Sequence, residues 1–205
     1  MIRSLLALLT LGCLASTTLA QEQPKPLELG SAAPMSDVLM KAVDGKEYSL
    51  ASVAGPKGTL VVFTCNSCPW AKAWQERVAA IGNAAAKRGV GAIAINANDP
   101  GRNPEDGFEE MARRAKSLGF TFPYAVDATS DLARGFGASS TPEAFLFDAK
   151  GLLVYHGTID DNAREPKAVK QRWLRQAVDA VAAGRTVATA ETKAMGCSIK
   201  FRAKS

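Results

Sequence analysis

The sequence predicts an α/β fold in which helices flank a central mixed sheet. Runs of β-branched and aromatic residues alternate with amphipathic stretches, glycines end those stretches, and hairpin signals occur both early and late in the chain. At 205 residues with 47% hydrophobic content, the chain is long enough to bury a core without disulfide staples.

The elements are expected in the order hairpin, alternating strands and helices, second hairpin and last helix. Strands that alternate with helices imply parallel pairing at the centre of the sheet, with the late hairpin as an antiparallel edge. The predicted strands are 38–42, 47–50, 59–64, 90–96, 122–126, 143–147 and 152–156. The predicted helices are 69–88, 104–118, 130–136 and 166–183.

The first twenty residues are typical of a cleaved secretory signal peptide. Arg3 supplies the positive charge, and residues 5–15 form an apolar stretch of about 11 residues, too short to span a bilayer. Small residues at Thr18 and Ala20 favour cleavage after Ala20. We therefore expect export, to the periplasm or alternatively to the medium, without stable membrane insertion. A lipid anchor through Cys13 is the competing interpretation.

The rest of the chain divides into three parts. Residues 21–33 form a proline-containing leader, and 34–184 form one domain. Residues 185–205 form a basic, mostly irregular tail that carries Cys197. The net charge of +5 is not gathered into one block, which argues against nucleic acid as a partner.

The motif Cys65-Asn66-Ser67-Cys68 lies where an apolar strand ends and a helix begins, with Pro69 directly after it. A helix N-terminus carries unpaired N–H groups and partial positive charge, which favours a thiolate on the first cysteine. We therefore expect Cys65 to be the more exposed sulfur and the nucleophile, and Cys68 to resolve the mixed disulfide. This chemistry needs no cofactor.

Other interpretations of the cysteines stay open. The pair can form a static disulfide or two buried thiols within a non-catalytic binding module. A copper or zinc chaperone using Cys65, Cys68 and Cys197 is a further alternative, although such sites need more soft or imidazole ligands than this chain offers. With Cys13 removed, three cysteines remain, so one thiol is left for exchange.

The motif at 65–68 and the dipeptide Thr141-Pro142, immediately before a strand, resemble the thioredoxin-like superfamily. The resemblance implies a thioredoxin fold with an N-terminal β-hairpin extension. It also implies a cis peptide bond at Pro142, which would lie beside Cys65 and dock the substrate. The Thr141 backbone would pair with an extended substrate segment, and the partners would be dithiol or disulfide proteins.

A closer resemblance is to a peroxiredoxin-like branch of the redoxin (alkyl hydroperoxide reductase/thiol-specific antioxidant) group. Peroxidatic redoxins carry a threonine three residues before the reactive cysteine, whereas this chain has Val62 before Cys65. We therefore expect disulfide exchange and keep thiol peroxidase as the alternative. The stretches that carry the resemblance are 65–70, 94–99, 104–106, 141–143, 157–162 and 196–201.

Several residues are candidate accessories to the thiols. Glu143 is interpreted either as a proton shuttle facing the sulfurs or as a surface acid on an edge strand. We expect Trp70 to shield the site and Trp74, one helical turn later, to be core. His156 is expected to be structural. Cys197 can dock beside the active site, stay free or pair between chains, and its place in the tail permits movement.

Overall fold

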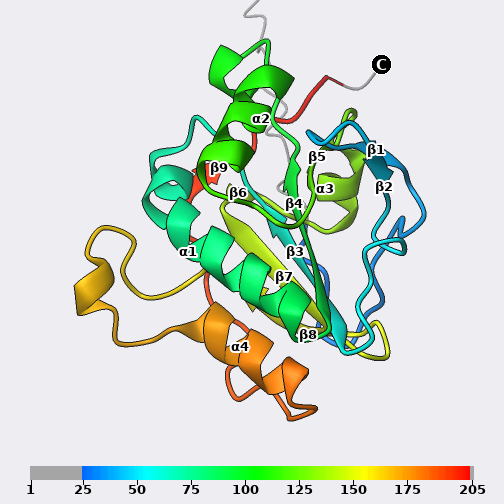
Figure 1. Ribbon diagram of the computed structural model, residues 1–205, viewed down its shortest axis with the longest axis vertical. Helices are drawn as coiled ribbons and strands as arrows, with labels where there is room; N and C mark the ends of the chain where they lie inside the picture. The colour runs from blue at the N-terminus through cyan, green and yellow to red at the C-terminus, as the bar shows by residue number, and fades with distance from the viewer. Residues whose placement is uncertain (1–24, 204–205) are drawn as a thin grey trace, which may run out of the picture.

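The computed structural model describes residues 25–203 of the chain (Figure 1). The predicted signal peptide at 1–20, including Cys13, lies outside the described residues, so export and lipid anchoring stay predictions. Between residues 25 and 203, no helix is both long enough and apolar enough to cross a membrane.

The elements follow the predicted order of hairpin, alternating strands and helices, hairpin and helix. The strands are β1 (Met40–Lys41), β2 (Glu47–Tyr48), β3 (Gly58–Phe63), β4 (Val90–Asn96), β5 (Tyr124–Val126), β6 (Ser140–Thr141), β7 (Glu143–Asp148), β8 (Leu153–Gly157) and β9 (Cys197–Ser198). The α-helices are α1 (Pro69–Lys87), α2 (Phe108–Ser117), α3 (Asp131–Gly135) and α4 (Trp173–Ala182), with short 3-10 helices η1 (Pro104–Asp106) and η2 (Pro166–Ala168).

Five strands form the central mixed sheet in the order β5-β4-β3-β7-β8. β3 pairs antiparallel with β7, β7 pairs antiparallel with β8, and β4 pairs parallel with β5. β4 lies along β3, and where the strands end the Thr64 amide donates to the Ile95 carbonyl at 2.9 Å. The prediction of an α/β fold with a mixed sheet and a late antiparallel hairpin is confirmed.

The sheet buries both faces, because side chains alternate along each strand. In β3, Leu60 and Val62 face one core, which α1, α2 and α4 complete. Val61 and Phe63 face a second core, which α3 and the β1–β2 region complete. Every residue of β3 is buried, so the strand delivers the chain to the 65–68 loop from a rigid support.

Two predicted helices are shorter in the structure than the sequence indicates. The predicted helix 104–118 is interrupted at Gly107, whose backbone is extended (φ −70°, ψ 157°), so η1 and α2 are separate. The predicted helix 166–183 is helical only in η2 and α4. The residues between them bond back to the loop before η2, as when the Lys170 amide donates to Asp161 at 3.0 Å.

The tail after α4 is mostly irregular, as predicted, but it is hydrogen-bonded to the rest of the fold. It runs beside β8, where the His156 amide donates to the Ala190 carbonyl at 2.9 Å and the Thr192 amide donates to the His156 carbonyl at 3.0 Å. It then forms β9, which pairs antiparallel with β6 near the start of α1 (Figure 1). The end of the chain is therefore part of the fold.

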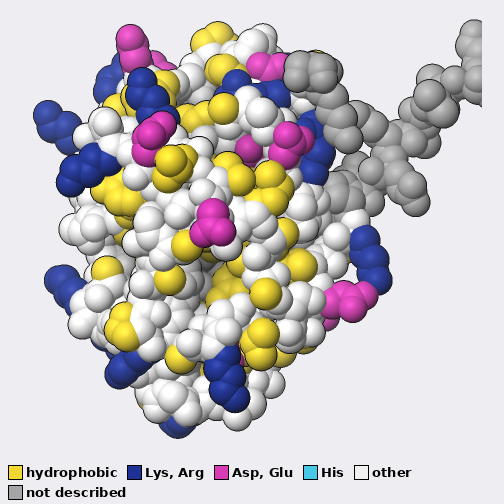
Figure 2. All heavy atoms as spheres, turned by 90° about the vertical axis from the view of Figure 1, so that its right-hand side faces the viewer, with side chains coloured by type: hydrophobic (Ala, Val, Ile, Leu, Met, Phe, Trp, Pro, Cys, Tyr) yellow, Lys and Arg dark blue, Asp and Glu magenta, His cyan; other side chains and the backbone are white. Residues whose placement is uncertain are grey.

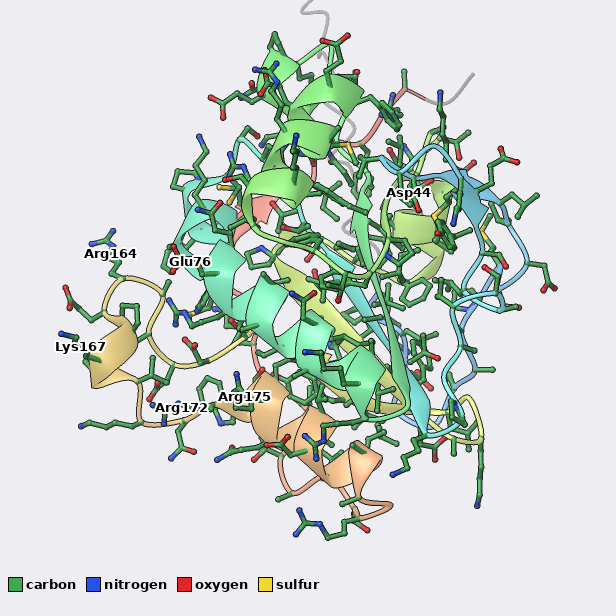
Figure 3. The ribbon with its side chains drawn as sticks, viewed as in Figure 1. Asp44, Glu76, Arg164, Lys167, Arg172 and Arg175 are labelled. Atoms are coloured by element: carbon green, nitrogen blue, oxygen red, sulfur yellow. The ribbon has the colours of Figure 1, made fainter. Side chains whose placement is uncertain are left out.

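The surface carries both apolar and basic side chains. Figure 2 shows apolar side chains among charged ones on one face, and the exposed large apolar residues are Leu29, Met35, Val38, Leu39 and Leu152. Exposed basic side chains gather around η2 and the start of α4 and point outward, as Arg164, Lys167, Arg172 and Arg175 do in Figure 3. These four come from one short stretch, although the charge along the whole sequence is dispersed.

Candidate active site

The cysteine motif forms the short loop between β3 and α1. Cys68 is the N-cap of α1, with extended backbone, and Pro69 is the first helical residue, where a missing N–H costs little. Cys65 and Cys68 are 5% and 3% exposed, and both are free thiols. The expectation that Cys65 is the more exposed sulfur therefore holds by only a small margin.

The loop between β6 and β7 faces both sulfurs. The Thr141–Pro142 peptide bond is cis, as the resemblance implied, and Pro142 is buried. The Thr141 hydroxyl lies 3.2 Å from Cys65 Sγ, and Cys68 Sγ lies 3.1 Å from the Thr141 carbonyl oxygen, to which it donates when it is protonated. Four of the residues that the sequence singled out therefore meet at one point, from segments more than 70 positions apart.

The pKa values of the two thiols are shifted in opposite directions. The hydrogen bond with Cys65 lowers the pKa of Cys68 to about 4, with further help from Cys197 and from the Ala71 N–H at the start of α1. The same hydrogen bond raises the pKa of Cys65, and burial and the charge of Asp106 act in the same direction. The two sulfurs share this hydrogen bond and titrate as a pair, so the expectation that the helix end favours a thiolate on Cys65 stays a prediction.

Asp106 is the residue of this site that the sequence interpretation missed. It is 2% exposed, and its Oδ1 accepts the backbone N–H groups of Asn66 at 2.7 Å and Ser67 at 3.0 Å. Its Oδ2 accepts from the Ser67 hydroxyl at 2.7 Å and from Asn98 Nδ2 at 2.9 Å. One buried carboxylate thus fixes the two residues between the cysteines. In the sequence, Asp106 is indistinguishable from an ordinary acid at the start of a helix.

Glu143 is buried at 1% exposure, so its interpretation as a surface acid is wrong. Its Oε2 accepts the backbone N–H groups of Ser139 and Ser140, both at 2.8 Å, and its Oε1 lies 2.6 Å from His156 Nε2. These contacts hold the loop that precedes Thr141 and do not direct the carboxylate at a sulfur. We therefore assign Glu143 to loop positioning, a role that differs from both interpretations of the sequence. His156 is its buried structural partner, stacked on Phe145.

The two tryptophans of α1 divide as expected. Trp70 is half-buried and packs against the cluster formed by Cys65, Cys68 and Ala71, and its ring centroid lies 5.7 Å from that of Trp74. Trp74 is fully buried, and its Nε1 donates to Asp160 at 2.7 Å. Trp70 therefore covers the cysteines, whereas Trp74 belongs to the core.

Cys197 lies beside the same cluster, half-exposed. Burial is the main reason that its pKa is raised, to about 11, and its hydrogen bond with Cys68 adds to the effect. Of the three alternatives left open for Cys197, this contact favours docking beside the active site. The expectation that the tail position permits movement finds no support, because β9 holds Cys197 against β6.

The cavity next to Cys65 is small. It measures about 20 Å³ and is lined by Asn66, Arg114 and Tyr124 among others, so it has room for a water molecule but not for an organic group. Within residues 25–203, no group of three or more His, Cys, Asp or Glu side chains is arranged to hold a metal ion. The three described thiols therefore do not form a metal cluster.

The model of the AhpC/TSA family matches residues 29–156. The chain belongs to this family. Cys65, Cys68, Thr141 and Pro142 all lie inside the matched region, whereas Cys197 lies beyond it. The family is one of thioredoxin-like redox proteins, so the fold and the general redox character agree with the geometry of the site.

Two solved structures are similar over nearly the whole chain. A hypothetical protein from Sinorhizobium meliloti is 36% identical, with a TM-score of 0.80, and the match covers 88% of this chain and 98% of that one. An uncharacterised conserved protein from Geobacillus kaustophilus is 34% identical, also with a TM-score of 0.80, covering 87% and 94% of the two chains. No curated protein sequence matches the chain.

A more distant neighbour is a secreted disulfide oxidoreductase from Mycobacterium tuberculosis. It is 16% identical, with a TM-score of 0.52, and the match covers 72% of this chain and 95% of that one. At this identity the likeness shows the shared thioredoxin fold alone. Within the AhpC/TSA family, this chain lacks the threonine three residues before Cys65, but Thr141 supplies a hydroxyl to that sulfur from another loop.

Proposed function

We propose that the protein is an exported thiol–disulfide oxidoreductase whose reacting groups are Cys65 and Cys68. The observation that carries the proposal is the meeting of two free thiols with Thr141 at the start of α1. A thiolate attacks disulfides, and a second nearby thiol resolves the product. Membership of the AhpC/TSA family supports a redox role, and export rests on the character of residues 1–20.

In the proposed reaction, Cys65 attacks one sulfur of a substrate disulfide. The Cys68 thiolate, which accepts the Cys65 hydrogen bond, takes the proton as Cys65 becomes the nucleophile. A mixed disulfide forms, and the first substrate sulfur leaves as a thiolate and is protonated. Cys68 then loses its proton and attacks Cys65 Sγ, which releases the second substrate thiolate. The substrate gains two electrons, and the protein ends as a Cys65–Cys68 disulfide that another dithiol protein reduces.

The residues around the sulfurs support these roles of Cys65 as nucleophile and Cys68 as resolving thiol. Thr141 contacts both of them and can hydrogen-bond a substrate sulfur that enters between the loops, with Pro142 as the docking element next to it. Asp106 fixes Asn66 and Ser67, so the spacing of the two cysteines is maintained when they react. Neither role requires a cofactor.

Trapping the mixed disulfide tests the proposal. A Cys68→Ser variant cannot resolve the intermediate, so glutathione disulfide should leave glutathione attached to Cys65, read by peptide mass spectrometry. The matched Cys65→Ser variant should react more slowly at Cys68. Faster labelling of Cys68 in Cys65→Ser would assign the attack to Cys68 instead. If neither cysteine in either variant forms a mixed disulfide, the protein is not a disulfide oxidoreductase.

Thiol peroxidase is a second candidate, favoured by the family and by the Thr141 hydroxyl at 3.2 Å from Cys65 Sγ. In that reaction Cys65 attacks a peroxide oxygen, water leaves, and the resulting sulfenic acid condenses with Cys68 to give a disulfide and a second water. Hydrogen peroxide consumption driven by a dithiol reductant, lost in Cys65→Ser, would establish it. Consumption no faster than in that variant would exclude it.

A further inference from the structure

The strand edge next to the candidate active site is already occupied. β9 pairs antiparallel with β6 (Figure 1). In this pairing Cys197 lies opposite Thr141, and Ser198 lies opposite Ser140. This is the backbone that the resemblance assigned to an extended substrate segment. The chain's own tail therefore lies where such a substrate would lie, and it presents a cysteine beside the thiols.

The tail beyond Cys197 is fastened by specific contacts. The Ile199 amide donates to the Ser139 carbonyl at 2.8 Å, and the Ile199 side chain is 5% exposed in the second core. The Lys200 amide donates to Asn98 Oδ1 at 2.9 Å. Backbone and side-chain contacts on both sides of the strand therefore fix the register of Cys197.

Gly196 allows this close approach. A Cβ at this position would lie 2.2 Å from the Thr141 carbonyl oxygen, well inside van der Waals contact. Any other residue would push the tail away from Thr141. The glycine directly before Cys197 thus brings the tail backbone against the loop that contacts both Cys65 and Cys68.

The third thiol interacts directly with the second. Cys197 packs against the cluster of Cys65, Cys68 and Ala71. Cys68 therefore has a thiol neighbour on each side, one in the loop and one in the tail.

We propose that Cys197 is a built-in disulfide partner of Cys68, so that the site has three redox cysteines and two alternative disulfides. This inference rests on the proposed function. The Cys197 thiolate attacks Cys68 Sγ in the Cys65–Cys68 disulfide and forms a Cys68–Cys197 bond. The Cys65–Cys68 bond breaks, and its electron pair leaves with Cys65 as a thiolate, which takes the proton that Cys197 released. No oxidant or reductant is consumed.

This arrangement has a consequence for the substrate. A polypeptide that adds to β6 as a strand has to displace residues 196–202, whereas a small disulfide has to reach only one sulfur. When the Cys68–Cys197 bond is present, the tail is tied down and Cys65 is free to react. The tail thus selects which thiol faces the substrate.

Disulfide mapping in a Cys65→Ser variant tests the proposal, with Cys13→Ser in every chain so that only the described cysteines remain. The protein is oxidised in a glutathione buffer, quenched in acid, alkylated and mapped by mass spectrometry. An intramolecular Cys68–Cys197 disulfide should exceed the mixed glutathione disulfides by about tenfold or more, because the tail holds the thiols at high effective concentration.

Two further variants of the Cys65→Ser chain separate placement from the mere presence of a third thiol. A Cys197→Ser, Ser198→Cys change moves the thiol by one residue to the other side of β9, and should lose the disulfide. Gly196→Ala keeps all thiols but pushes the tail from Thr141, and should slow formation of the Cys68–Cys197 bond. With Cys65 restored, both variants should still form the Cys65–Cys68 disulfide.

The outcomes also separate this inference from the proposed function. If Cys68 and Cys197 stay as separate thiols or mixed disulfides in Cys65→Ser, while Cys197→Ser forms Cys65–Cys68, the inference is wrong and the proposed function stands. If Cys68–Cys197 forms but Cys65–Cys68 never does, Cys197 is the partner and the proposed pair is wrong. A protein that forms neither disulfide contradicts both.

Discussion

Two buried carboxylates hold the two loops of the candidate site in the same way but in different electrical surroundings. Asp106 accepts the consecutive backbone N–H groups of Asn66 and Ser67, in the cysteine loop. Glu143 accepts those of Ser139 and Ser140, in the loop before Thr141. Each is at most 2% exposed. One buried carboxylate therefore holds each loop in place through two backbone hydrogen bonds.

The difference lies in what else each acid touches. Glu143 is hydrogen-bonded to His156, with 2.6 Å between Oε1 and Nε2. The other partners of Asp106 are the neutral groups of Ser67 and Asn98, and its charge acts on Cys65. We conclude that Glu143 positions its loop only, whereas Asp106 positions its loop and also tunes a thiol. The predictions below separate these two roles.

The largest effect concerns the charge of the thiols. In the reduced protein, one thiolate should persist from neutral pH down to about pH 4, because the pKa of Cys68 is lowered to about 4. Its ultraviolet absorbance should vanish in Cys68→Ser and should persist in Cys197→Ser. Loss of all thiolate absorbance near pH 8.5, where an ordinary free thiol titrates, would contradict the assigned charge of Cys68.

The Asp106→Ala variant should lower the free energy of unfolding by about 3 kcal/mol. It leaves the amides of Asn66 and Ser67 and the side chain of Asn98 without their acceptor. Denaturant unfolding of the reduced protein measures the loss. The neighbouring Glu105→Ala removes only an exposed ion pair with Lys72, and should cost less than about 0.5 kcal/mol. Equal losses in the two variants would mean that Asp106 does not fasten the loop.

Glu143→Ala should cost about 2 kcal/mol, because two loop amides and His156 lose their partner. The thiolate titration of the reduced variant should stay where it is in the wild type. His156→Gln, which removes one contact of Glu143 but keeps the amides bonded, is the matched control and should cost less. A titration that moves in Glu143→Ala would show that the two acids act alike.

The smallest effect is the sharpest test of the difference between the acids. In a Cys68→Ser background, Asp106→Asn should lower the pKa of Cys65, because a neighbouring negative charge that raises it is removed. Alkylation of Cys65 by iodoacetamide at mildly alkaline pH should then be several-fold faster. Glu143→Gln in the same background should leave the rate unchanged. If the two substitutions change the rate equally, the Asp106 charge is not what acts on Cys65.

The parts of this molecule that local chemistry determines were accessible from the sequence. The apolar run that ends at Thr64 predicts a strand, and Pro69 predicts the start of a helix. Together they place Cys65 and Cys68 at a strand-to-helix junction. The assignment of Thr141 to the same site came from the family resemblance. The split of the predicted helix 104–118 was missed, because Gly107 is extended in the structure and the pattern gives no such signal.

Contacts between residues far apart in the sequence could not be predicted from the sequence pattern. Asp106 is 40 positions from Asn66, and a helix-start acid needs no further explanation locally. β9 has two residues and no periodicity, so its pairing with Thr141 leaves no pattern in the tail. The lowered pKa of Cys68 depends first on its hydrogen bond with Cys65 and then on Cys197, and tertiary geometry sets the contact with Cys197.

The reduction potential of the Cys65–Cys68 pair tests the central claim most directly. The protein with Cys13→Ser and Cys197→Ser is equilibrated with glutathione buffers of graded ratio, and the fraction of Cys65–Cys68 disulfide is measured. We predict one two-electron transition, between about −270 and −120 mV, the range of known thioredoxin-fold dithiols. No disulfide at any ratio, with both thiols inert to alkylation, would contradict the claim that these cysteines exchange disulfides.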